Sequence, residues 1–91
     1  MQLAMLRVEV RIGEGPRARR RTVRKILEKI HRHFNVSVAE DDRGGTPEES
    51  VLGFASVDAG RREAREVLER VADVVAAHPR VEVLKVDLTE L

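Results

Sequence analysis

The chain has 91 residues, the size of one ordinary domain, and its formal net charge is only +1. An apolar fraction of 42% and a charged fraction of 36% are typical of a folded globular protein. The absence of cysteine excludes disulfides and thiolate metal sites, and the 2% aromatic content is poor material for a drug-sized ligand pocket. No apolar run approaches a membrane span and no signal peptide is recognisable, so we expect a single cytoplasmic domain over residues 1–91, without membrane contact.

The first third of the chain predicts one strand followed by one helix. Residues 6–12 alternate between apolar and charged side chains, which is typical of a half-buried strand. Its inward side chains are Leu6, Val8, Val10 and Ile12. After the break at Gly13-Glu14-Gly15-Pro16, apolar residues recur at helical spacing from residue 17 to residue 34. They are Val23, Ile26, Leu27, Ile30 and Phe34, and they predict an amphipathic helix.

The remaining two thirds predict two strands, a second helix and a last strand. Residues 36–39 and 51–57 are apolar enough for strands, with a loop from Glu40 to Ser50 between them. Asp58 is a candidate cap for a helix that ends at His78-Pro79. The buried stripe of that helix is Ala64, Val67, Leu68, Val71, Val74 and Val75. Residues 81–88 form the last strand, whose alternation slips near Leu84 and indicates a bulge or an edge.

This order of elements predicts a fold class. Strand, helix, strand, strand, helix, strand is the α+β ferredoxin-like βαββαβ unit, a four-stranded antiparallel sheet with two helices packed on one face.

The charge is distributed very unevenly along the chain. Residues 1–35 hold ten basic and three acidic residues (+7), whereas residues 36–91 hold seven basic and thirteen acidic ones (−6). Such a division between the two halves of a chain indicates contact with nucleic acid or another anionic surface.

Most of the positive charge gathers at the start of the first predicted helix. The residues concerned are Arg17, Arg19, Arg20, Arg21, Arg24 and Lys25. Cations at a helix N-terminus oppose the helix dipole, and clustered arginines are good phosphate ligands, so we predict that these six contact a phosphate backbone. On a helical wheel Arg19 and Arg20 flank the buried stripe and are placed to reach toward the sheet edge. The alternative is a solvated helix face in a protein that prefers arginine.

The third strand raises the question of base stacking on the sheet. Residues 52–57 partly match the strand pattern of RNA-recognition modules, but Leu52 replaces its basic residue and Ser56 its second aromatic. Ordinary strand packing is the simpler interpretation of Phe54. If Phe54 pointed away from the helices, Leu52 and Phe54 would form an apolar patch with Leu3 and Met5, and this patch would bind a protein partner or a second copy.

Enzymatic functions find little support in the sequence. Acylphosphatases share this size and fold, but the loop after the first strand lacks their Gly–Val–x–Phe–Arg signature, and the one asparagine is Asn35. His31 and His33 point in different directions on a helix and cannot share a metal. We therefore expect no catalytic residue, no metal site, no cofactor and no small-molecule substrate, although an acylphosphatase-like hydrolase stays a minor alternative.

Several stretches resemble the YlxP-like family of small bacterial proteins of unknown function. The most specific is Phe34-Asn35-Val36-Ser37-Val38-Ala39-Glu40; the others are Leu6-Arg7-Val8-Glu9, Val51-Leu52-Gly53-Phe54-Ala55 and His78-Pro79-Arg80-Val81-Glu82-Val83. The run Arg19-Arg20-Arg21-Thr22-Val23 stands where that family has a basic helix start. The chain departs from the family at Gly13-Glu14-Gly15-Pro16 and in the loop from Asp41 to Ser50, which has no aromatic residue.

The resemblance implies a ferredoxin-like fold and, because bacterial members are often encoded among translation and ribosome-maturation factors, a role beside RNA or the ribosome. Together with the basic helix, it predicts a non-catalytic domain that contacts the phosphate backbone of RNA. The alternative is a homodimer or a protein-interaction module that uses the open face of the sheet.

Overall fold

The computed structural model describes residues 1–13, 15–41, 46–58 and 60–91. Glu14 and the loop residues Asp42, Gly44 and Gly45, on which expectations above depend, lie outside the described residues. The elements are β1 (Gln2–Arg11), α1 (Pro16–His33), β2 (Ser37–Asp41), β3 (Glu49–Asp58), α2 (Arg61–Ala77) and β4 (Glu82–Glu90). Neither helix, over the residues that the structure describes, is long and apolar enough to cross a membrane.

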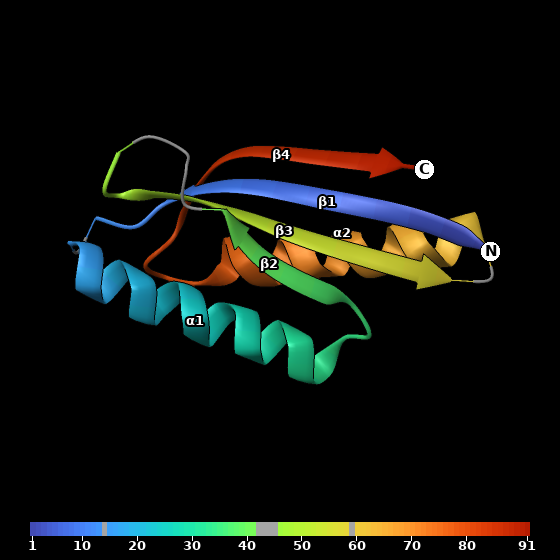
Figure 1. Cartoon of the computed structure of the whole chain (residues 1–91), viewed down its shortest axis with the longest axis horizontal. Helices are drawn as coiled ribbons and strands as arrows, with labels where there is room; N and C mark the ends of the chain where they lie inside the picture. Colours follow the sequence, from blue (N-terminus) through green and yellow to red (C-terminus); the bar gives the residue numbers. More distant parts are fainter. Residues whose placement is uncertain (14, 42–45, 59) are drawn as a thin grey trace.

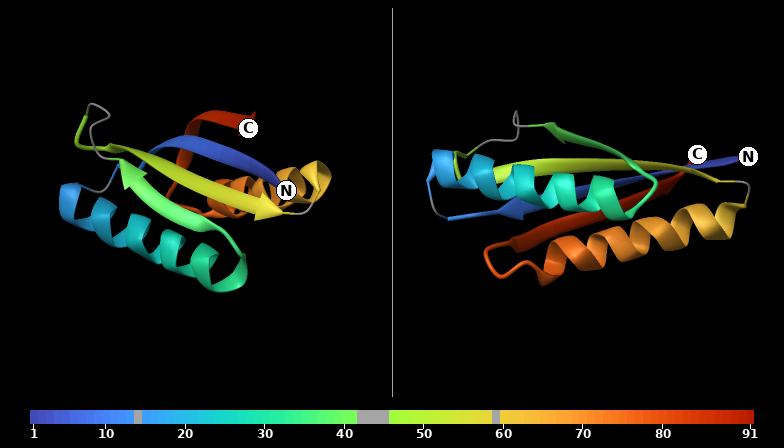
Figure 2. Two further views of the ribbon diagram at one scale, coloured as in Figure 1. Left: turned by 45° about the vertical axis from the view of Figure 1, so that its right-hand side comes forward. Right: turned by 90° about the horizontal axis from the view of Figure 1, so that it is seen from below.

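The four strands form one antiparallel sheet in the order β2-β3-β1-β4. β1 lies at its centre and pairs with β3 from Gln2↔Asp58 to Arg11↔Glu49, while β2 and β4 are the edges. Both helices lie on the same side of the sheet, and the other face is open (Figures 1 and 2). The predicted ferredoxin-like βαββαβ fold is therefore confirmed.

The core fills the space between the helices and the sheet. Alternate residues of β1 point into it, including Leu6 and Val8, which are at most 2% exposed. From the helices come the two predicted apolar stripes, whose fully buried members are Val23, Ile26 and Ile30 on α1 and Ala64, Leu68, Val71 and Val75 on α2. The inward residues of the first strand and both helix stripes were thus correctly predicted.

Two local predictions have opposite outcomes: the irregularity in the last strand is confirmed, and the helix cap at Asp58 is not. β4 contains the expected irregularity, because Glu9 pairs with Lys85 while Val10 pairs with Val83, leaving Leu84 as the extra residue of a bulge on an edge strand. The capping prediction for Asp58 is wrong. β3 continues through this residue, and the N-cap of α2 is Gly60, with no side-chain cap.

The prediction of an interaction patch at Leu52 and Phe54 is also wrong. Both side chains lie in the core, with exposed fractions of 0% and 2%. The reason is the strand register: Phe54 lies opposite Leu6 and Leu52 opposite Val8, and residues opposite each other in an antiparallel pair share a face. Strand packing, the simpler interpretation of Phe54, is correct.

Candidate nucleic-acid interface

The basic segment begins at a sharp turn into α1. Gly15 has a positive φ of 88°, a conformation that favours glycine, and its carbonyl accepts a hydrogen bond from the Arg19 backbone N–H at 2.9 Å. Pro16 then occupies the first helical turn, where its missing N–H costs nothing. The first turn of α1 contains no acidic residue to balance the partial positive charge of the helix N-terminus.

Five of the six predicted contact residues lie on the surface. They are Arg17, Arg20, Arg21, Arg24 and Lys25, and all are exposed. Within the part of the chain that the structure describes, none of these five takes part in an ion pair or a side-chain hydrogen bond. The N-terminal half of α1 therefore presents five cations that the described residues leave unneutralised; we call them the α1 cations.

The sixth residue is Arg19, and the structure contradicts the prediction that it contacts nucleic acid. Arg19 is only 7% exposed. Its guanidinium Nη1 donates a hydrogen bond to Ser50 Oγ and lies 3.4 Å from Glu40 Oε2. Ser50 Oγ donates to the same carboxylate at 3.1 Å, which closes a network between α1, β2 and β3. Arg19 precedes Val23 by four residues, so it belongs to the buried stripe, and it reaches the sheet edge as the helical wheel indicated.

The α1 cations divide between two sides of the helix. Toward β2, Arg20 and Arg24 line a hollow of about 350 Å³ whose wall also contains Glu28 and Glu40. Toward the α2–β4 connection, Arg21 and Lys25 line hollows shared with three basic residues that the sequence analysis did not select. These are Lys29, His78 and Arg80. The spacing of Arg21, Lys25 and Lys29 by four residues could have identified the first of them.

The open face of the sheet has a different character at its two ends. Near the end of β3, Leu3, Met5 and Val57 are exposed by 38%, 48% and 52%. At the other end the cations are paired: Arg11 lies 3.2 Å from Glu49 and 3.6 Å from Glu82. The described residues of this face therefore offer an apolar patch and no free cluster of positive charge.

The structure does not assemble the residues of the minor enzymatic alternative. Gly15 precedes α1 and Asn35 follows it, and 18 helical residues separate them by about 27 Å along the helix axis. Among residues 1–13, 15–41, 46–58 and 60–91, no group of three His, Asp or Glu side chains is placed to hold a metal ion.

Comparison with known proteins shows the fold and the family. A de novo designed protein, Foldit4, aligns over 96% of both chains with 21% identity and a TM-score of 0.65. A putative chlorite dismutase aligns with 99% of this chain, but this chain spans only 44% of that one, with 13% identity and a TM-score of 0.60. No curated protein matches the sequence. The model of the "Protein of unknown function (DUF503)" family matches residues 3–88, and the chain therefore belongs to the DUF503 family.

Proposed function

We propose that this chain is a non-catalytic domain that binds the phosphate backbone of structured RNA, on its own or in the ribosome, through the α1 cations. The observation that supports the proposal is the group of five exposed cations at Arg17, Arg20, Arg21, Arg24 and Lys25, which have no anionic partner among the described residues. The YlxP-like resemblance favours the same function by association.

The arrangement has an energetic cost that a polyanion would remove. An exposed cation in the first turn of a helix, as at Arg17, is destabilising by about 0.3–1 kcal/mol, and the cations further along the helix repel their neighbours three and four residues away. Phosphate groups would neutralise the cations and meet the partial positive charge of the helix end at the same time. Binding of this kind releases counterions from the nucleic acid, so its affinity falls steeply as salt rises.

The test compares two variants that lose the same charge on different helices. The first is Arg20→Gln/Arg21→Gln/Arg24→Gln on α1, and the second is Arg62→Gln/Arg65→Gln/Arg70→Gln on α2. Binding to purified ribosomal subunits and to a structured RNA is measured across a salt series. We expect the α1 variant to lose most of the affinity and to reduce the salt slope by about 1 for each lost phosphate contact. The α2 variant should bind like the unmodified protein.

Two outcomes would contradict the proposal. If the unmodified protein binds no RNA even at low salt, the α1 cations form a solvated helix face. If both triple variants lose affinity equally, binding depends on net charge and not on α1.

A second candidate function rests on the open sheet face. The exposed side chains of Leu3, Met5 and Val57 form an apolar patch, since Leu3 pairs with Val57 and Met5 with the adjacent Ala55. Self-association or partner binding would then use these residues in place of Leu52 and Phe54. Sedimentation velocity tests it: a dimer of the unmodified protein that Met5→Asp dissociates would support the second candidate, and a monomer at all concentrations would remove self-association.

A further inference from the structure

Two adjoining hollows lie where α1 faces the C-terminal end of α2 and the turn into β4. The first, of about 290 Å³, is lined by the basic residues Arg21, Lys25, His78 and Arg80. The second, of about 380 Å³, has Lys25 and Lys29 at its rim. Lys25 and His78 line both hollows, so the two hollows lie side by side.

The two hollows differ in chemistry. The charged side chains lining the first are all basic, and no carboxylate is among the lining residues, which suits an anionic group such as a phosphate. The second is lined mainly by apolar side chains, namely Ile26, Val74, Ala77 and Pro79. Its volume falls within the range of about 300–1,000 Å³ that is usual for small-molecule sites. An apolar hollow beside a cationic one fits a ligand with a flat, weakly polar part next to a negative charge.

We propose that these two hollows together receive one unpaired nucleotide of a bound RNA. The phosphate lies against Arg21 and Lys25, and the base enters the apolar hollow beside Ile26 and Ala77. This inference rests on the proposed function and deepens it, because it specifies which RNA is preferred. Bases inside a regular duplex are stacked and inaccessible, so only a nucleotide in a bulge, loop or end can enter.

A purely structural role explains only part of this cluster. The last turn of α2 contains no basic residue, so Lys25 and Lys29 could serve to balance the partial negative charge of that helix end. That role would require neither the additional cations Arg21 and Arg80 nor an apolar hollow open beside the lysines. The two explanations predict different results when a bulkier side chain occupies the apolar hollow. A nucleotide site should lose its preference for an unpaired base, whereas a purely structural role of the lysines predicts no such change.

The experiment uses three probes with the full chain: a blunt-ended RNA duplex, the same duplex with one bulged uridine, and free uridine monophosphate. Affinities are measured by fluorescence anisotropy, with the free nucleotide as a competitor. We expect the bulged duplex to bind about tenfold more tightly than the paired one, a difference of about 1.4 kcal/mol.

A matched pair of variants locates this preference. Ala77→Leu places a bulkier apolar side chain in the apolar hollow and narrows it without changing charge, and Ala76→Leu adds the same side chain at the neighbouring position, which does not line it. Both alanines are exposed, so neither change disturbs the core. Ala77→Leu should abolish the preference for the bulge while leaving binding of the paired duplex intact, and Ala76→Leu should preserve the preference.

The outcomes separate this inference from the proposed function. Equal affinity for the two duplexes, or a preference that survives Ala77→Leu, would overturn the nucleotide site and leave backbone binding standing. Binding of neither duplex would overturn both. Tight binding of free uridine monophosphate without RNA binding would assign the hollows to a mononucleotide and also overturn the RNA inference.

Discussion

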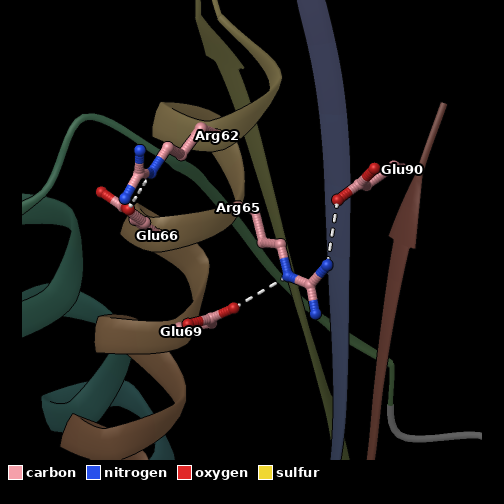
Figure 3. A network of polar contacts seen from close by, with 5 residues as sticks. All are labelled: Arg62, Arg65, Glu66, Glu69 and Glu90. Atoms are coloured by element: carbon pink, nitrogen blue, oxygen red, sulfur yellow. Dashed lines mark hydrogen bonds and ion pairs between the residues drawn. The ribbon is translucent and has the colours of Figure 1, made fainter.

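The two helices cover the same face of one sheet and are nearly equal in length, yet they treat their arginines in opposite ways. On α2 two of the arginines are paired: Arg62 Nε lies 3.0 Å from Glu66, and Arg65 lies 2.9 Å from Glu69 and 3.5 Å from Glu90 (Figure 3). The α1 cations, on the N-terminal half of α1, have no such partner among the described residues. The difference follows from the sequence: no acidic residue stands between residues 16 and 27 of α1, whereas on α2 Glu66 and Glu69 each follow an arginine by four residues.

The helices also differ in how they attach to the sheet. Among the α2 residues whose burial is described, the buried ones are all apolar, and the helix lies over β1, β3 and β4. α1 lies toward the edge strand β2 and adds the ion pair of the buried Arg19 with the partly exposed Glu40 to its apolar stripe. Since one arginine of the basic run is committed to holding α1 in place, the run combines a structural role with a surface role.

The largest effect is expected from giving α1 the pairing pattern of α2. In the double variant Arg24→Glu/Lys25→Glu, a carboxylate follows Arg20 and Arg21 at four residues' distance, the spacing of Arg62 and Glu66. RNA affinity at low salt should fall about 100-fold, because two cations become anions and two more are neutralised. The free energy of unfolding should be unchanged or rise by about 0.2–0.5 kcal/mol for each new pair.

Filter binding and thermal denaturation of the same samples measure both effects. Loss of binding together with retained stability would assign the loss to the surface and not to unfolding. A double variant that binds RNA like the unmodified protein would show that α1 is not the contact helix.

An intermediate effect is expected at the ion pair that holds α1. Glu40→Ala leaves the guanidinium of Arg19 buried without its carboxylate, and removing one partner of a buried pair is costly. Because the Glu40 side chain is 29% exposed, we expect a loss of about 2 kcal/mol in the free energy of unfolding, less than for a fully buried pair.

Urea denaturation provides the measurement, and Arg19→Met is the control. It removes the buried charge and leaves Glu40 at a partly exposed position, so it should cost less than Glu40→Ala. If Arg19→Met were the more destabilising variant, the aliphatic packing of Arg19 and not the ion pair would hold the helix.

Much of this fold is predictable from periodicity alone. The alternation from Leu6 to Ile12 and the helical stripes on α1 and α2 identify the residues that are buried in the structure, because one face of each element must meet the core. The slip near Leu84 even locates the bulge of β4. The Asp58 cap failed because local capping signals do not tell where a strand ends, and here β3 pairs with β1 through Asp58 itself.

The site is less predictable, because it depends on contacts between elements distant in sequence. Arg19 has a charged side chain in an apolar stripe, and its burial follows only once Glu40 and Ser50 are brought beside it by β2 and β3. Leu52 and Phe54 could be assigned to the core only through their register with Leu6 and Val8. His78 and Arg80 join the α1 cations because the turn after α2 passes beside that helix, which no local pattern indicates.

The smallest effect is expected from the reverse change, which gives α2 the free arginines of α1. Glu66→Gln/Glu69→Gln removes the carboxylate partner of Arg62 and leaves Arg65 paired with Glu90. The pKa of Arg65, which the hydrogen bond and charge of Glu69 raise, should move back toward its usual value. Exposed pairs at this spacing contribute little, so loss of the Arg62–Glu66 pair should lower the free energy of unfolding by about 0.3–0.5 kcal/mol. The loss should diminish further as salt screens the charges.

RNA affinity is the decisive readout for this last variant. Its net charge is two units more positive, but the freed arginines lie on α2 and away from the basic hollows beside α1. If RNA binding depends on where the free cations lie, the RNA affinity of this variant should stay within about twofold of that of the unmodified protein. The general gain from a more positive net charge should be small, because physiological salt largely screens it. A tenfold gain would mean that any free arginine on either helix is sufficient, and the contrast between α1 and α2 would then be one of charge alone and not of a site.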